Sequence, residues 1–219
     1  MTPLASKTLA GLGGLAAVGG GGALAWQQGA FSSSPKSIKE RLIDDKYEIL
    51  DQGSSKWTEI FNVYKGDGNT KWKFENDGIS NSSQNTDIPK LKGKCQEILN
   101  KISSDEKSYS LASKWCVVPR KLNSFLDSAS FLNDQETENE SQAEWKKILD
   151  KYTATKTAET KYAMSDVTLE VASGTSKDAD NIKKIKKGCQ DRKEKYNYSL
   201  DFEDSLKEVK SWCTKEAAK

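Results

Sequence analysis

The stretch WTEIFNVY at residues 57–64 decides the fold of this chain, because a matching stretch, WKKILDKY, occurs at residues 145–152. Both follow the pattern Trp-x2-Ile-x3-Tyr. Side chains spaced by three, four and seven positions lie on one face of an α-helix. The two stretches are therefore predicted to form helices that bury the same aromatic face.

Other blocks of sequence around these helices also occur twice, in the same order. They share residue types and helical spacing: Pro35-x2-Ile38-x3-Leu42 with Pro119-x2-Leu122-x3-Leu126, Ile88-x2-Leu91-x3-Cys95-Gln96 with Ile182-x2-Ile185-x3-Cys189-Gln190, and Trp115-Cys116 with Trp212-Cys213. Ordered self-similarity of this kind indicates an internal duplication. We expect an all-α fold of two related helical-bundle repeats, residues 35–118 and 119–219. Residues 1–34 would precede them as an N-terminal transmembrane helix and tether.

The apolar spacing predicts helices that are separated by polar stretches. They cover about residues 37–50, 57–65, 88–102, 106–117, 122–132, 145–152, 182–196 and 201–215. Ser37 and Asp201 are predicted N-caps, and Ser103 with Glu106 has the spacing of a capping box. The residues expected in the repeat cores are Trp57, Ile60, Tyr64, Trp115, Trp145, Ile148, Tyr152 and Trp212.

Charge and composition argue against several classes of function. The 219 residues include 34 basic and 32 acidic side chains, a net charge of +2, whereas a nucleic-acid-binding protein would favour a basic face. The chain has no histidine, which removes the commonest general base and metal ligand. The sequence also lacks the G-x-x-x-x-G-K-[ST], G-x-S-x-G and H-E-x-x-H motifs. We therefore expect no nucleic-acid partner, no catalytic, cofactor or metal site, and no enzyme activity.

The N-terminal stretch at residues 8–26, TLAGLGGLAAVGGGGALAW, contains no charged side chain. A helix of this length at about 1.5 Å per residue matches one hydrocarbon core. We expect an uncleaved single-span membrane anchor, with a cleaved signal peptide ending at the A-x-A sequence of residues 23–25, or a disordered glycine-rich tail, as alternatives. Gly13, Ala17, Gly21 and Ala25 form a stripe of small residues through which two spans could pair as a homodimer.

Two signals disagree on which side of the membrane the remainder of the chain lies. Only Lys7 precedes the apolar stretch, whereas Lys36, Lys39, Arg41 and Lys46 follow it. That excess of basic residues favours a cytoplasmic location. Disulfide-bonded cysteines would favour an oxidising compartment instead. We give the cysteines more weight and expect a single-pass protein of the cell membrane with an extracellular ectodomain.

The four cysteines divide into one pair for each predicted repeat. The midpoint of Cys95 and Cys116 lies beside the predicted capping box, and the midpoint of Cys189 and Cys213 is Asp201. Residues equidistant from the turn of an antiparallel helical hairpin lie at the same height, and a disulfide needs Cα atoms about 4.4–6.8 Å apart. We predict the disulfides Cys95–Cys116 and Cys189–Cys213. Four buried free thiols in a cytosolic core and a metal site are the alternatives.

Two other features allow a binding role but have a simpler interpretation. The paired aromatic helices could form a binding surface, yet their spacing is that of one buried face, so we interpret them as core. The stretch at residues 177–195 has eight basic and four acidic side chains, and 8 − 4 gives a net charge of +4. It could contact an anion weakly, but we interpret it as a solvated helix face.

The arrangement of these motifs resembles that of the uncharacterised paralogous membrane or surface proteins of haemotropic mycoplasmas. The resemblance rests on the glycine- and alanine-rich N-terminal span, on S-I-K-x-R-L at residues 37–42, on the Trp-x2-Ile-x3-Tyr helix, on Cys95-Gln96 and on Trp115-Cys116. It covers essentially the whole chain. It implies a membrane-associated protein displayed at the cell surface, and it supplies no catalytic residue.

The function predicted from these features is binding. The leading prediction is a membrane-anchored surface protein that takes part in host contact, adhesion or antigenic decoy. The polar stretches at residues 66–87 and 133–144 would contact a host-surface macromolecule while a rigid helical frame presents them. The alternative is an intracellular, membrane-tethered scaffold with free core cysteines.

Overall fold

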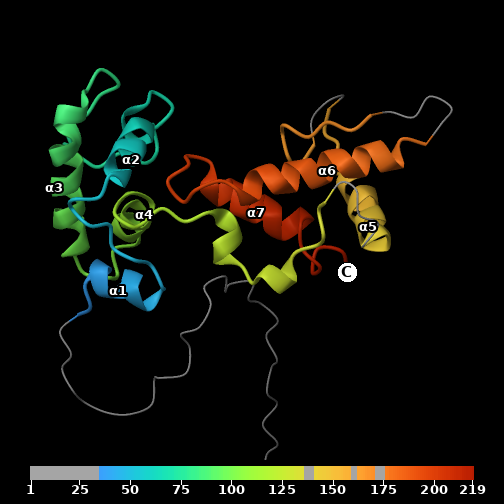
Figure 1. The fold of residues 1–219 in the computed structure, drawn as a ribbon, viewed down its shortest axis with the longest axis horizontal. Coiled ribbons are helices and arrows are strands. Elements are labelled where there is room, and N and C mark those ends of the chain that lie inside the picture. Colours follow the sequence, from blue (N-terminus) through green and yellow to red (C-terminus); the bar gives the residue numbers. More distant parts are fainter. Residues whose placement is uncertain (1–34, 136–140, 159–161, 171–175) are drawn as a thin grey trace, which may run out of the picture. The chain divides into compact units, whose positions relative to one another are not determined.

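The computed structural model describes residues 35–135, 141–158, 162–170 and 176–219, all within one unit, Pro35–Lys219. Figure 1 shows the helices of this unit: α1 Ile38–Asp44, α2 Lys56–Lys65, α3 Ile88–Leu99, α4 Glu106–Trp115, α5 Gln142–Thr153, α6 Asp178–Lys193 and α7 Phe202–Trp212. Three short 3-10 helices are η1 Asn85–Asp87, η2 Leu122–Phe125 and η3 Ser128–Ser130. The described segments contain isolated β-bridges but no strand, so the all-α class is confirmed for them.

Several predictions concern residues outside the described part of the chain. These are the apolar stretch at 8–26, the A-x-A sequence at 23–25, and the small-residue stripe of Gly13, Ala17, Gly21 and Ala25. Among the helices that the structure does describe, none has both the length and the apolar character needed to cross a bilayer.

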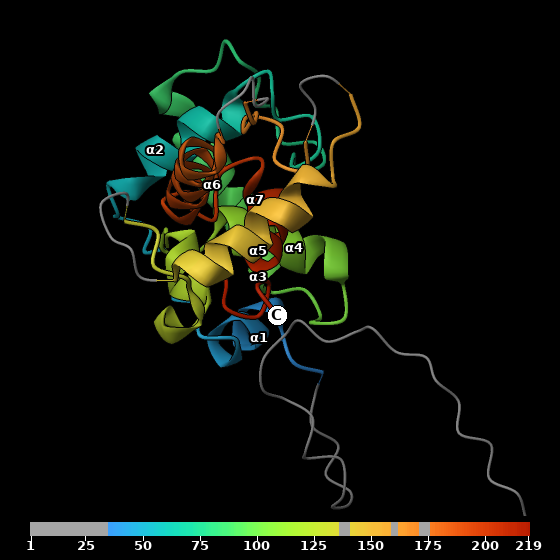
Figure 2. The ribbon, with the colours of Figure 1, turned by 90° about the vertical axis from the view of Figure 1, so that its right-hand side faces the viewer.

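Two separate hydrophobic cores hold the unit together. The first half (residues 35–118) packs α3 against α1, α2 and α4, and the second half (residues 119–219) packs α6 against α5 and α7. The view in Figure 2, turned by a quarter, keeps α1 at the lower edge of the unit, as in Figure 1. The largest side chains buried in the two cores are those of Trp57, Tyr64, Trp115, Trp145 and Tyr152.

The first helix is shorter than predicted. Ser37 caps α1 as expected, and the side chain of Glu40 accepts a hydrogen bond from the Ser37 N–H in return. The helix ends at Asp44 rather than near residue 50, and Lys46 has a φ of 66°. Beyond it the chain lies along the end of α4, where the Leu50 N–H donates to the Cys116 carbonyl at 3.0 Å. This pairing replaces the helical hydrogen bonds that residues 45–50 would otherwise form.

The predicted helix at residues 122–132 is also wrong. The chain forms η2 and η3 instead, separated by Leu126 in an extended conformation. The Asp127 carboxylate accepts from the Ala129 N–H at 2.9 Å, and the Ser124 hydroxyl donates to the Lys121 carbonyl at 2.7 Å. Such local side-chain hydrogen bonds compete with the α-helical backbone pattern, which explains the shorter turns.

Two predicted helix caps differ from those observed. The N-cap of α4 is Asp105, whose carboxylate accepts from the Ser108 N–H at 3.0 Å, so the predicted capping box of Ser103 and Glu106 is not formed. Glu106 instead forms an ion pair with Arg41 at 2.7 Å. Asp201 occupies the N-cap position of α7, but its side chain forms no capping hydrogen bond and pairs with Lys195. Glu106 and Asp201 are thus each engaged in an ion pair instead of the predicted capping hydrogen bond.

The two polar stretches are only partly exposed in the structure. In residues 66–87, Asn69, Phe74 and Ile79 are buried, whereas residues 80–82 and 84–86 are exposed. In residues 133–144, Asp134 is 6% exposed, and residues 136–140 lie outside the described part. Only portions of both stretches therefore belong to the surface that the structure describes.

Candidate functional site

The centre of the first half is a disulfide between α3 and the end of α4. Cys95 and Cys116 have Cα atoms 5.4 Å apart and are each 1% exposed. This is the pairing predicted from the midpoint of the hairpin. The bond excludes these two thiols from metal binding or nucleophilic chemistry while it is intact, because both functions need a free thiolate.

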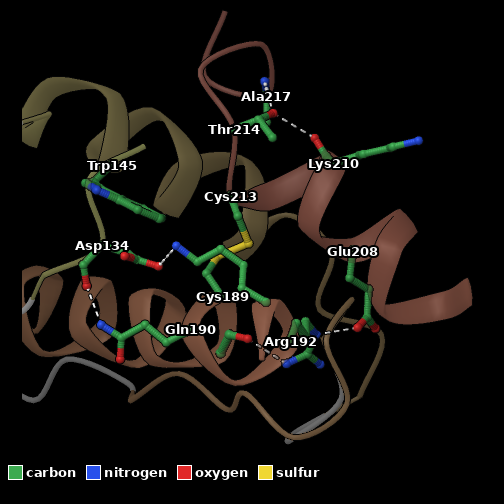
Figure 3. Close-up of a disulfide and its surroundings, with 12 residues drawn as sticks. Asp134, Trp145, Cys189, Gln190, Arg192, Glu208, Lys210, Cys213, Thr214 and Ala217 are labelled. Atoms are coloured by element: carbon green, nitrogen blue, oxygen red, sulfur yellow. Dashed lines mark hydrogen bonds and ion pairs between the residues drawn. A yellow bond between two sulfur atoms is a disulfide. The ribbon is translucent and has the colours of Figure 1, made fainter. Parts of the chain in front are cut away.

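The second half has a corresponding disulfide between α6 and the end of α7. The Cα atoms of Cys189 and Cys213 are 5.7 Å apart. Figure 3 shows this bond between the two ribbons, with Trp145 and Asp134 on one side and Arg192 and Glu208 on the other. All four cysteines of the chain are thus paired within their own halves.

An aromatic pair accompanies each disulfide in the same geometry. Tyr64 meets Trp115 edge to face with ring centroids 5.1 Å apart, and Tyr152 meets Trp212 edge to face at 5.2 Å. Trp115 is fully buried, whereas Trp212 is half-buried. Edge-to-face contacts of this kind stabilise a core beyond the area that they bury.

The two tyrosine hydroxyls hold the polypeptide that follows each aromatic helix. The Tyr64 hydroxyl accepts from the Phe74 N–H at 2.8 Å and donates to Asp77. The Tyr152 hydroxyl accepts from the Met164 N–H at 3.2 Å and lies 2.9 Å from the Val167 carbonyl oxygen. Burial raises the pKa of Tyr152 to about 12, so the hydroxyl stays protonated at neutral pH. Both hydroxyls are engaged in structural hydrogen bonds.

The first tryptophan of each half is also fixed in the same way. The indole N–H of Trp57 donates to the Asp51 carbonyl at 2.8 Å, and that of Trp145 donates to the Asn133 carbonyl at 2.7 Å. A lysine ammonium lies 5.8 Å from each indole ring, from Lys92 in one half and Lys186 in the other. These contacts explain why large aromatic side chains with a polar atom can be fully buried.

Backbone hydrogen bonds repeat as well. Leu50 N–H donates to the Cys116 carbonyl and Leu132 N–H donates to the Cys213 carbonyl, both at 3.0 Å. The N–H groups of Ile38 and Leu122 donate to the carbonyls of Lys101 and Lys195, both at 2.8 Å. Each half thus uses corresponding residues to attach its first segment to its helical hairpin.

Another difference between the halves concerns one pair of side chains on the helical hairpin. Ile98 and Leu111 pack in the first half, each under 10% exposed. Three residues after the second-half Cys189 stands Arg192, 4% exposed in its side chain, which pairs with Glu208 and Asp166. Burial opposes the charge of Arg192, but the hydrogen bonds that it donates to both acids outweigh this effect and raise the pKa of the guanidinium. An apolar pair in one half is therefore replaced by an ion-pair cluster in the other.

Lys114 joins the two halves. Its side chain is 1% exposed, and its Nζ lies 3.0 Å from Glu203 Oε1. The ammonium also donates to the carbonyls of Ser199 at 2.8 Å and Asn197 at 3.3 Å, and it lies 4.5 Å from the Trp72 ring. Burial lowers the pKa of Lys114, and Glu203 partly offsets this effect. All three ammonium donors are used, so this lysine has no donor left for a ligand.

Other contacts between the halves surround Lys114. The Asn197 amide donates to the Ser113 carbonyl at 2.9 Å, and the Trp72 indole donates to the Leu200 carbonyl at 3.2 Å. A cavity of about 200 Å³ beside Lys114 is lined by aromatic and polar side chains that include Tyr47, Phe202 and Glu203. The sequence carries no signal for this junction, because a lysine on an amphipathic helix is expected to face solvent.

The basic side chains of the lysine-rich stretch, residues 177–195, mostly pair with acids inside and outside the stretch. Lys184 pairs with Glu170 at 2.9 Å, Lys187 pairs with Asp191, and Lys193 pairs with the buried Asp134. Within the described segments no three His, Cys, Asp or Glu side chains cluster in a way that could hold a metal ion. The ion pairs that Lys184 and Lys193 form therefore connect parts of the second half to one another.

Comparisons of the chain with protein-family models, with curated proteins and with solved structures found no match.

Proposed function

We propose that this protein is a membrane-anchored surface protein that acts by binding, without catalysis. Residues 8–26 would form its single membrane span, and the Pro35–Lys219 unit would be the extracellular part. That unit would consist of two related helical-bundle repeats, residues 35–118 and 119–219. The observation that carries this proposal is the pairing of all four cysteines within their own halves.

The disulfides support an extracellular location because of where such bonds persist. Disulfides are stable in oxidising compartments and are rare in the reducing cytosol. Buried, well-packed disulfides of this kind stabilise a small domain by restricting its unfolded state. The unit has two modest cores and a strongly charged surface, so this stabilisation would matter outside the cell.

The proposed duplication is supported by contacts that recur between the halves. The edge-to-face pairs Tyr64–Trp115 and Tyr152–Trp212 are one example. The backbone hydrogen bonds from Leu50 to Cys116 and from Leu132 to Cys213 are another. Unrelated helical hairpins have no physical reason to share this set of contacts at matching sequence positions.

The contact surface for a host macromolecule would lie on the exposed part of residues 66–87. Residues 80–82 and 84–86 are exposed, polar and uncharged, and they follow a segment that Phe74 and Ile79 fix to the core. A polar loop on a rigid frame is suited to recognition, because few residues must be ordered when a partner binds. The predicted resemblance to surface proteins of haemotropic mycoplasmas favours the same proposal.

The alternative function is an intracellular, membrane-tethered scaffold. It is favoured by the basic residues that follow the apolar stretch, Lys36, Lys39, Arg41 and Lys46, because such residues mark the cytoplasmic side. In that location the cysteines would be reduced core thiols. The two functions therefore differ in topology and in the redox state of the cysteines.

Labelling of intact cells that produce the full-length chain distinguishes the two. A Lys207→Cys variant supplies an accessible thiol, because the Lys207 side chain is 78% exposed. We expect a membrane-impermeant maleimide to label this variant on intact cells but leave the unsubstituted chain unlabelled until a reductant is added. Labelling of Lys207→Cys only after lysis would contradict the surface location and favour the scaffold.

A further inference from the structure

Among the described residues, two isoleucines are the large hydrophobic side chains that are exposed. Ile43 is 51% exposed and Ile102 is 54% exposed. Both belong to the first half. Large aliphatic side chains with this exposure indicate a contact surface when they lie at the same end of a domain.

Both isoleucines lie at the end of the unit where the chain passes from residue 34 into the fold. Ile43 is on α1, and Ile102 forms an antiparallel bridge with Ser37, the residue that caps α1. The Ser103 N–H donates to the Lys36 carbonyl at 2.7 Å and secures this arrangement. Figures 1 and 2 both place α1 at the lower edge of the unit.

The corresponding positions of the second half show that the fold does not require these isoleucines. Asp127 stands eight residues after Pro119, as Ile43 stands eight residues after Pro35. Tyr196 forms the bridge with Lys121 that corresponds to the bridge of Ile102 with Ser37, and its ring stacks on Tyr198 at 5.3 Å. A polar residue and a packed tyrosine thus replace the two exposed isoleucines.

Two lysines at this end of the unit are exposed and form no ion pair within the described segments. Asp44 pairs with Lys36 at 2.7 Å, and Asp45 accepts a hydrogen bond from the Tyr109 hydroxyl at 2.6 Å. Lys39 and Lys46 are exposed, and neither ammonium forms an ion pair within the described segments. Glu40, which accepts hydrogen bonds from Ser37, and Glu48 also form no ion pair within the described segments, so the two lysines are available to a phosphate without giving this end a net positive charge.

We infer that this end of the unit rests on a phospholipid bilayer. Ile43 and Ile102 would enter the headgroup region, and Lys39 and Lys46 would lie near lipid phosphates. The inference rests on the proposed membrane span at residues 8–26. Residues 27–34 separate that stretch from Pro35, and eight residues can reach at most about 29 Å at 3.6 Å each. The chain therefore keeps this end, rather than the second half, close to the bilayer.

Full-length protein in vesicles tests the inference. Ile43→Cys, Ile102→Cys and the control Lys207→Cys would each carry an environment-sensitive fluorophore, in vesicles of phosphatidylcholine with or without phosphatidylglycerol. We expect lipids with nitroxide-labelled headgroups to quench the probes at positions 43 and 102, and to quench the probe at 207 much less. Equal quenching at all three positions in chains that float with the vesicles would overturn the inference and leave the membrane span intact.

Two further results separate the parts of the proposal. Failure of the full-length chain to float with vesicles would overturn the membrane span itself, and the inference with it. A chain with Ile43→Asp and Ile102→Tyr, the residues of the second half, should still float but should be cut faster by trypsin after Lys39 and Lys46 than the unsubstituted chain. Equal cutting rates would contradict a bilayer contact through the isoleucines.

Discussion

Lys114 Nζ in α4 lies 3.0 Å from Glu203 Oε1 in α7, and this pair joins the two halves although the lysine side chain is only 1% exposed. The Glu203 side chain is 39% exposed, so the two partners are unequally buried. Removal of one partner should therefore have a different effect from removal of the other.

Glu203→Leu should destabilise the protein more than Lys114→Met. The first change leaves a buried ammonium without its acid, which typically costs about 3–5 kcal/mol. The second leaves a half-exposed carboxylate, which water can solvate, and the Asn197 carbonyl without its donor, about 1–3 kcal/mol, because the Ser199 carbonyl still accepts from the Phe202 N–H. Urea unfolding of the oxidised chain would measure both. Lys207→Ala on the same helix is the control, with an expected change within about 0.5 kcal/mol. Equal losses for both variants would contradict this account.

The stability contributed at Lys114 should rise with pH. Burial lowers the pKa of Lys114 below its ordinary value of 10.5, so the unfolded chain binds more protons between the folded-state pKa and 10.5. The penalty for burying the ammonium is fully present below that window and is relieved as pH rises through it. At alkaline pH the free energy of unfolding of the unsubstituted chain should therefore increase relative to that of Lys114→Met. A difference that is constant with pH would show that the ammonium is not buried.

Tyr152→Phe should destabilise the second half and remove part of its alkaline sensitivity. The hydroxyl contacts the backbone of Met164 and Val167, and loss of these hydrogen bonds should cost about 1–3 kcal/mol. Burial raises the Tyr152 pKa from 10.0 to about 12. The stability from this raised pKa is fully present below about pH 10 and is lost as pH rises toward 12. Between about pH 10 and 12, the free energy of unfolding should fall less steeply with pH for Tyr152→Phe than for the unsubstituted chain. Equal slopes for the two proteins would argue against a raised pKa of Tyr152.

Gly188→Ala should destabilise the protein, whereas Gly93→Ala should not. A Cβ at Gly188 would lie 2.5 Å from Val167 Cγ2, and overpacking of this kind typically costs about 1–3 kcal/mol. A Cβ at Gly93 would meet no atom within 4 Å, and alanine in a helix interior is favoured over glycine by roughly 0.5–1 kcal/mol. Thermal unfolding of both variants measures the difference. A Gly188→Ala chain that is as stable as Gly93→Ala would mean that the 162–170 segment does not pack on α6.

The ion-pair cluster of the second half should be replaceable by the apolar pair of the first. Arg192→Ile alone leaves the half-buried Glu208 unpaired and should cost about 1–3 kcal/mol. Arg192→Ile with Glu208→Leu should be nearly neutral. A double-mutant cycle in urea gives the coupling energy. Additive losses would contradict the structural equivalence of Ile98 with Arg192 and of Leu111 with Glu208.

Regular features of the sequence predict much of the fold. The positions of α2, α4 and α5 follow from apolar spacing, and the disulfide pairing follows from the symmetry of a helical hairpin. The failures occur where side chains act against the local pattern. Asp127 and Ser124 divide a predicted helix into short turns, and Arg41 engages Glu106, so Ser103 and Glu106 do not form the predicted box.

The junction between the halves could not be predicted for a different reason. Lys114 and Glu203 are far apart in sequence, and both are residue types that usually face solvent. The second half has three more residues between its cysteines than the first, because the separations are 24 and 21. Residues in this longer turn accept the hydrogen bonds of Lys114, and no local periodicity marks that role.

The disulfides themselves test the account most directly. Non-reducing peptide mapping of the full-length protein, isolated from the cells that produce it, should yield two cross-linked species, Cys95 with Cys116 and Cys189 with Cys213, and no thiol that is alkylated before reduction. Each bond closes a loop of similar length, 21 and 24 residues, and should contribute about 3 kcal/mol. Cross-links between the halves, or four thiols that alkylate without reduction, would contradict the proposal of two separately closed helical repeats on the cell surface.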